Sequence, residues 1–136
     1  MPQFSPKSLG QLATCCIDLQ TLFNEVIKYF DCTVTEGFRD EADQNQAYAE
    51  GKTQLKWPNG NHNHSPSTAV DVYPYPVDMD DTRRFYFFAG RVLGIADMLL
   101  AQGKITHKIR WGGDWNSDTQ VKDNNFNDLV HYEIVP

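Results

Sequence analysis

The chain has 136 residues, of which 40% are hydrophobic and 22% charged, so it can bury a core and does not belong to the disordered class. Its formal net charge of -6 excludes the basic surface of a general nucleic-acid-binding protein and offers no attraction to anionic membranes. We expect one domain over residues 1–136, a monomer without a nucleic-acid partner or a stable membrane association.

The N-terminal segment and the cysteines point to a reducing compartment. The first ten residues lack a basic region followed by an apolar stretch, so no signal peptide is expected. Cys15, Cys16 and Cys32 are odd in number and two of them are adjacent, which does not fit a disulfide framework. We expect reduced thiols in a chain made in a cytoplasm without an export signal of its own.

In the first half of the chain, apolar periodicity predicts two helices and a strand. Ser8 is expected to cap a first helix, whose apolar residues recur at helical spacing as far as Tyr29. Residues 32–38 are typical of a short strand. A second helix is predicted over residues 40–50, with Asp40 as its cap.

In the second half, a long polar loop over residues 52–67 precedes a strand that ends at Pro74. A third helix is predicted between a cap at Asp80 or Asp81 and Gly103. Two more strands are expected at residues 107–113 and 129–135. Because helices and strands are mixed without strict alternation, we predict an α+β fold with a mainly antiparallel sheet flanked by about three helices.

Asp71 lies within an apolar run that is typical of a buried strand, where a carboxylate is costly unless opposite charge compensates it. One hypothesis is a metal ion bound by His64, Asp71 and His131, because a catalytic zinc takes three protein ligands and leaves a fourth position for water. The alternative is an ion pair of Asp71 with Arg39 or Arg110. No HExxH motif is present, so the residues leave both hypotheses open.

The metal hypothesis requires a turn in the chain between its first two ligands. Seven residues of straight strand would place His64 and Asp71 on opposite faces. The segment 65–67, which contains Pro66, makes such a turn plausible.

Three motifs occur together in the chain: GFRDEADQNQ at 37–46, HSPSTAVD at 64–71 and DLVHYEI at 128–134. They resemble the sites of zinc metallopeptidases of the D-alanyl-D-alanine carboxypeptidase type, most closely those of small phage endolysins that are L-alanyl-D-glutamate peptidases. Segments 8–22 and 109–116 also look like parts of those endolysins, so the resemblance covers nearly the whole chain.

The resemblance implies a zinc ion held by His64, Asp71 and His131, with Asp128 as the general base. Zinc lowers the pKa of a bound water toward ~7, and a carboxylate beside that water can take its proton and return it to the leaving amine. Glu133 is implied as a group that orients the imidazole of His131, whose strand face it shares.

The resemblance also implies that Arg39 binds substrate and stabilises the developing oxyanion. The alternative for Arg39 is an ordinary surface ion pair with Asp40 or Glu41. His62 stands where the family has a serine, so it is an alternative metal ligand, a substrate contact or simply a loop residue. Ser67 replaces a family glycine, which leaves the path of this loop open.

A second metal hypothesis concerns the loop after residue 113. Asp114, Asn116 and Asp118 have the D-x-N-x-D spacing with which a loop surrounds Ca²⁺. The glycine and the terminal glutamate of an EF-hand are absent, so the alternatives are a solvated polar loop and a calcium-ordered flap.

We therefore predict a hydrolase, a zinc metallopeptidase that cuts peptidoglycan stem peptides at the L-alanyl-D-glutamate bond. By the resemblance it is a bacteriophage endolysin that waits in the host cytoplasm and degrades the cell wall during host lysis, once the membrane is permeabilised. The alternatives are a D,D-carboxypeptidase or dipeptidase acting on D-alanyl-D-alanine termini, and a non-catalytic zinc-containing binding module.

Overall fold

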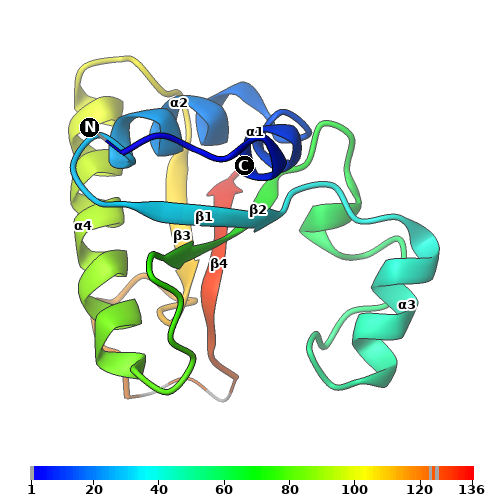
Figure 1. The fold of residues 1–136 in the computed structure, drawn as a ribbon. Coiled ribbons are helices and arrows are strands. Elements are labelled where there is room, and N and C mark those ends of the chain that lie inside the picture. The colour runs from blue at the N-terminus through cyan, green and yellow to red at the C-terminus, as the bar shows by residue number, and fades with distance from the viewer. Residues whose placement is uncertain (1, 123, 125) are drawn as a thin grey trace.

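The computed structural model of the chain describes residues 2–122, 124 and 126–136 (Figure 1). In these residues it has four α-helices, one short 3-10 helix and four strands. In chain order they are α1 (Pro6–Leu12), α2 (Ile17–Val26), β1 (Cys32–Glu36), α3 (Glu41–Ala49), η1 (Asn61–Asn63), β2 (Ala69–Pro74), α4 (Thr82–Ala101), β3 (Lys108–Gly112) and β4 (Asp128–Val135). No helix of the described residues is long and apolar enough to span a membrane.

The four strands form one antiparallel sheet in the order β1-β2-β4-β3, which confirms the predicted α+β class. Strands β2 and β4 form the central pair, and their register places Asp71 directly opposite His131. Two residues 60 positions apart in the chain therefore become neighbours because of strand pairing alone.

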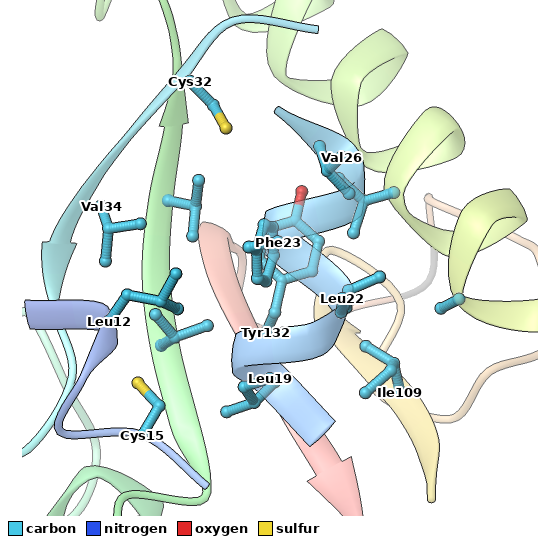
Figure 2. Packing of buried hydrophobic residues seen from close by; sticks show 14 of the residues in the cluster. Leu12, Cys15, Leu19, Leu22, Phe23, Val26, Cys32, Val34, Ile109 and Tyr132 are labelled. Atoms are coloured by element: carbon cyan, nitrogen blue, oxygen red, sulfur yellow. The ribbon is translucent and has the colours of Figure 1, made fainter. Parts of the chain in front are cut away.

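The hydrophobic core lies between the sheet and helices α2 and α4 (Figures 1 and 2). Phe23 of α2 packs edge-on against Tyr132 of β4, with the ring centroids 5.4 Å apart, and both side chains are fully buried. Since side chains alternate along a strand, burial of Tyr132 on the helix side turns His131 to the opposite face. The core thereby decides which face of the sheet is left for polar groups.

The single first helix predicted from Ser8 is wrong: the chain forms α1 and α2 with a break between them. Ser5 caps α1, while the Ser8 hydroxyl accepts a hydrogen bond from the Val34 N–H of β1. At the break, the Ser67 backbone forms hydrogen bonds on both sides of Cys15. The Ser67 N–H donates to the Thr14 carbonyl at 2.8 Å, and the Ser67 carbonyl accepts from the Cys16 N–H at 2.8 Å. Helical periodicity cannot reveal this contact, because the paired residues Cys15 and Ser67 are 52 positions apart in the chain.

The other boundaries agree with the predictions. Asp40 caps α3 by accepting the Asp43 N–H, and Asp81 caps α4. The three cysteines are free thiols, and burial raises the pKa of Cys15 and Cys32 to about 12. Such thiols are protonated and unreactive at neutral pH.

A buried carboxylate joins α2 to the segment that leads into β3. Asp18 accepts hydrogen bonds from the backbone N–H groups of Thr106 and His107, at 2.9 and 3.0 Å, and from the His107 ring at 2.7 Å. Burial by itself would raise the pKa of Asp18, but the bonds from His107 and Thr106 outweigh it and hold the pKa below its ordinary value.

Replacing Asp18 by asparagine is expected to lower the free energy of unfolding at pH 7 by about 1.5–3 kcal/mol, the range for hydrogen bonds to a charged group. Because the folded-state pKa is lowered, this contribution is complete above the ordinary value of 3.8 and disappears as pH falls through the folded value. Urea unfolding at pH 7 and at acidic pH measures both effects. The same change at exposed Asp97 is the control, and an equal loss in both variants would contradict the prediction.

Candidate metal centre and active-site cleft

Three side chains from separate segments converge on the polar face of the sheet: His62 from η1, Asp71 from β2 and His131 from β4. The Asp71 Oδ1 atom lies 3.2 Å from His62 Nε2 and 3.6 Å from His131 Nδ1. All three candidate donor atoms lie within 4.8 Å of one another, close enough to bind a single ion.

The first ligand predicted from the sequence requires a correction, because His64 is exposed and does not belong to this group. The turn of η1 buries His62, whose ring lies next to the Gly37 carbonyl, and His64 already ends that turn. The chain after His64 reaches the break between α1 and α2, where Ser67 forms its backbone hydrogen bonds, and β2 then begins at Ala69. The segment that connects His62 to Asp71 is therefore two residues longer than the predicted connection from His64 to Asp71.

The hydrogen bonds of both histidines leave the correct ring nitrogen free for a metal. His62 Nδ1 lies 2.7 Å from the Gly37 carbonyl oxygen, which can only accept, so Nδ1 carries the proton and Nε2 has a lone pair. His131 Nε2 lies 2.6 Å from Glu133 Oε1, which leaves Nδ1 of this ring for the shared centre. Two imidazoles and one carboxylate are a donor set of catalytic zinc sites, so these residues fit the metal.

Glu133 is held in place from its other side by Arg110 of β3. The Arg110 Nη2 and Nε atoms donate to Glu133 Oε2 at 2.7 and 3.1 Å, and Glu133 is buried. Burial alone would raise the pKa of Glu133, but hydrogen bonds from His131 and Arg110 outweigh it and lower the pKa to about 2. Glu133 is therefore an ionised carboxylate whose Oε1 atom contacts His131 and whose Oε2 atom contacts Arg110.

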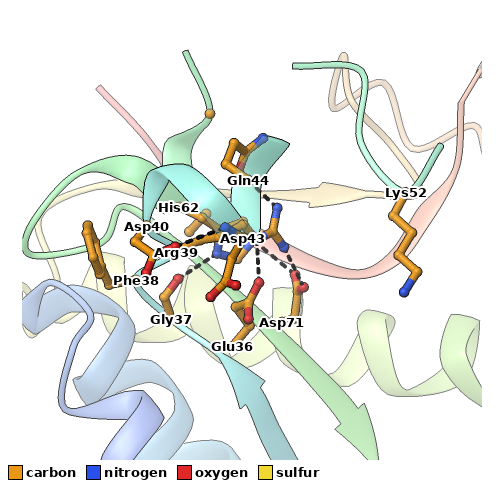
Figure 3. A network of polar contacts seen from close by, with 12 residues as sticks. Glu36, Gly37, Phe38, Arg39, Asp40, Asp43, Gln44, Lys52, His62 and Asp71 are labelled. Carbon is orange, nitrogen blue, oxygen red and sulfur yellow. Dashed lines mark hydrogen bonds and ion pairs between the residues drawn. The ribbon is translucent and has the colours of Figure 1, made fainter. Parts of the chain in front are cut away.

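The charge of the half-buried Asp71 is compensated on several sides (Figure 3). When the two histidines are protonated, their charge and hydrogen bonds outweigh the effect of burial and hold the pKa of this carboxyl well below its usual range. Arg39 Nη2 lies 3.6 Å from Asp71 Oδ2, and Arg39 Nε donates to Glu36. These are the ion pairs of Arg39 among the described residues, so it does not form the alternative surface pair.

Asp128 lies beside the group of candidate ligands, with its Oδ2 atom 3.8 Å from His131 Nδ1. Burial, and after it the charge of Asp71, raise the pKa of Asp128 to about 6. Residues three apart in a regular strand point to opposite faces. Here the pairing register shifts between Trp111 and Gly112, so that Gly112 pairs with Asp128 and the intervening residues of β4 bulge. A Cβ atom on Gly112 would overlap the Asp128 carbonyl, so glycine permits this close approach.

Two clefts, of about 720 and 470 Å³, share three lining residues: Arg39, Phe126 and Asp128. Both extend between the sheet and residues 40–60, which contain α3 and which we call the α3 lobe; Figure 1 shows α3 standing away from the sheet. The smaller cleft also contains His62, His131 and Trp115, whose ring centroid lies 5.4 Å from that of His131. The candidate metal centre is thus open to a groove, formed by the two clefts between the sheet and the α3 lobe.

Comparison with known proteins agrees with this geometry. The family model of the phage L-alanyl-D-glutamate peptidase matches residues 1–135. The chain belongs to this family. The fold is similar to the crystal structure of Serratia marcescens L-Ala D-Glu endopeptidase ChiX, with a TM-score of 0.72 and 21% sequence identity over 98% of this chain and 90% of that chain. No curated protein matches the chain.

Membership of the phage L-alanyl-D-glutamate peptidase family confirms the predicted resemblance and the prediction of a peptidoglycan hydrolase. Sequence reasoning offered Arg110 as an ion-pair partner of Asp71, but in the structure Arg110 pairs with Glu133 and Arg39 pairs with Asp71. It gave no role to Gln44, which contacts Arg39. The contact of Arg110 with Glu133 follows from the pairing of these two residues on neighbouring strands, and that pairing is known only once the sheet order is known.

The predicted calcium loop of this phage peptidase is a turn built on hydrogen bonds. The Asp114 carboxylate accepts the backbone N–H groups of Asp118 and Thr119, at 3.2 and 2.9 Å. The Asn116 amide donates to Asp118. These bonds explain the D-x-N-x-D spacing as turn chemistry, and calcium binding stays a prediction.

Proposed function

We propose that the chain is a zinc-dependent endopeptidase that hydrolyses the L-alanyl-D-glutamate bond of peptidoglycan stem peptides. The observation that carries this proposal is the convergence of His62, Asp71 and His131 at a groove beside Asp128 and Arg39. A structural zinc site fills its fourth position with a protein ligand, whereas a catalytic site leaves it for water or substrate. Here that side of the group faces the groove.

In this proposal the metal is held by His62 Nε2, an Asp71 carboxylate oxygen and His131 Nδ1. When bound, a divalent ion supplies Lewis acidity to the scissile carbonyl and to water. Glu133 keeps the His131 ring in the tautomer and orientation that present Nδ1, and Arg110 keeps Glu133 in place.

Asp128 takes the proton of the attacking water and returns it to the amine of D-glutamate as the C–N bond breaks. Its position at the start of β4, between the two clefts, suits a group that must reach both water and leaving amine. Arg39 also lines both clefts and presents a permanent positive charge where the carbonyl oxygen becomes negative.

Mass spectrometry of purified peptidoglycan, digested with and without a zinc chelator, tests the proposal. We expect chelator-sensitive release of peptides that begin at D-glutamate, with L-alanine left on the glycan. Loss of terminal D-alanine would instead assign a D,D-carboxypeptidase, and no cleavage by folded, zinc-loaded protein would assign a binding module.

Arg110→Met is expected to weaken zinc binding by about 10- to 100-fold, the usual effect of removing a group that orients a metal ligand. Without Arg110, the buried Glu133 carboxylate loses both of its hydrogen bonds on Oε2. Competition titration against a chelator measures the change. Arg91→Met on the exposed side of α4 is the matched control, and equal zinc affinity in both variants would contradict the role of Arg110.

The site of action follows from the substrate. We propose a monomer that accumulates in the host cytoplasm and reaches the peptidoglycan once the membrane is permeabilised. The family of phage peptidases supports this proposal.

A further inference from the structure

The α3 lobe is attached to the catalytic face through a buried amide. Gln44 is the buried residue of α3, with a relative exposure of 1%, at a helix position where an apolar side chain is usual. Apart from Gly60, the other residues of the α3 lobe are exposed or half-buried. A buried polar side chain of this kind requires hydrogen-bond partners, and its partners indicate its role.

Among the described residues, Gln44 makes three hydrogen bonds, and Figure 3 shows the one with Arg39. Its Nε2 atom donates to the Leu55 carbonyl at 2.6 Å, and its Oε1 atom accepts from Arg39 Nη1 at 3.1 Å and from Asn63 Nδ2 at 3.0 Å. The Leu55 carbonyl can only accept, so it fixes which end of the amide carries the oxygen. The Gln44 oxygen therefore has to face the Arg39 guanidinium.

Asn63 extends this contact to the segment that carries His62. The Asn63 amide also donates to the Arg39 carbonyl at 3.1 Å, and its oxygen accepts the Gly60 N–H at 2.9 Å. A Cβ atom on Gly60 would lie 2.9 Å from Asn63 Oδ1 and 3.1 Å from Gln44 Nε2, so a larger residue here would displace these two amides. The Arg39 N–H in turn donates to the His62 carbonyl at 2.8 Å.

We propose that Gln44 is a positioning residue for Arg39: its amide, oriented by Leu55, holds the guanidinium at the junction of the two clefts. This inference rests on the proposed function, in which Arg39 stabilises the transition state. Gln44 touches neither the three candidate metal ligands nor Asp128 through any hydrogen bond among the described residues. Its effect on the reaction is therefore expected to pass through Arg39.

The neutrality of Gln44 is what distinguishes it from the other partners of Arg39. Glu36 and Asp71 carry negative charges and partly cancel the charge of the guanidinium. An amide oxygen fixes the Nη1 end without adding a third anion. Positive charge thus remains available for the substrate carbonyl.

A double-mutant cycle tests the proposal on the zinc-loaded, full-length protein, with a purified muropeptide as substrate. Gln44→Met is expected to lower kcat/KM by about 10- to 100-fold in the wild-type background, as for loss of a supporting contact in an active site. In the Arg39→Ala background, measured under single-turnover conditions, the same change is expected to alter kcat/KM by no more than about twofold. Zinc content is expected to stay at the wild-type level in all four proteins.

Gln20→Met is the matched control, because it removes a half-buried glutamine amide that binds the Cys15 carbonyl far from the clefts. It is expected to retain wild-type kcat/KM. A Gln44→Met effect of the same size in both backgrounds would overturn the proposal, as would loss of zinc or an Arg39→Ala variant as active as the wild type.

Gln44→Glu covers the case in which Gln44→Met does not fold. It preserves side-chain shape and adds a charge next to Arg39, so kcat/KM is expected to fall in the wild-type background only. A fall in both backgrounds would overturn the proposal. If the wild-type protein itself shows no chelator-sensitive cleavage, the proposed function fails, and the inference fails with it.

Discussion

His62→Ala is expected to abolish zinc-dependent cleavage, whereas His64→Ala retains it. His62 is buried with its Nε2 atom 3.2 Å from Asp71, while His64 is exposed two residues further on. Loss of a direct ligand is expected to weaken zinc binding by more than about 100-fold, the upper range for groups that only orient a ligand. Elemental analysis of the two purified variants and their kcat on peptidoglycan measure the outcome.

The two histidines serve as controls for each other, because the substitution is identical and both lie in the same loop. Thermal unfolding in the presence of a chelator shows whether either change affects the apo fold. Full zinc in His62→Ala, or zinc loss in His64→Ala, would contradict the assignment of the ligand.

Asp128→Asn is expected to retain zinc and to lower kcat by about 10²- to 10⁴-fold, the usual contribution of a general acid–base group. Asparagine has nearly the same shape but cannot take a proton from water. Steady-state kinetics on a purified muropeptide, together with elemental analysis, separate loss of turnover from loss of metal.

Asp97→Asn, an exposed change on α4, is the control for this substitution and is expected to have wild-type kinetics. Wild-type kcat in Asp128→Asn would exclude the residue as the base. A parallel loss of zinc would show that Asp128 contributes to metal binding instead.

Most elements of the fold were predictable because their signals are local. The caps at Asp40 and Asp81 and the apolar runs of the strands depend on neighbouring residues only. The break between α1 and α2 was not predictable, because it depends on the pairing of Cys15 with Ser67. Periodicity describes a helix face and contains no information about a distant loop that interrupts it.

The candidate site likewise contains residues whose positions were predictable from the sequence and one whose position was not. Asp71 and His131 could be predicted to lie close together because each belongs to a recognisable strand, and the sheet register makes them neighbours. The third residue of the group, His62, lies in the segment between strands, where spacing in sequence does not determine position in space. The turn of η1 buries His62 and exposes His64, a choice that depends on the Gly37 carbonyl and on the path of residues 64–68.

Asp128 is an instructive case, since alternation in a regular strand would direct it away from His131. The resemblance to the family indicated its role, but the bulge opposite Gly112 provides the geometry. Bulges depend on the partner strand, so a single strand sequence does not reveal them.

The composition of the α3 lobe has a consequence for the local opening motions of the enzyme. Its buried residues are Gln44 and Gly60, so little apolar area opposes its detachment from the sheet. We expect the cooperative unit formed by the core, which carries Asp71 and His131, to have a higher opening free energy than the α3 lobe. Amide protons of α3 will exchange with solvent through local openings that leave β2 and β4 protected. One wall of the groove can therefore move to admit a bulky polymer while strands β2 and β4 stay rigid.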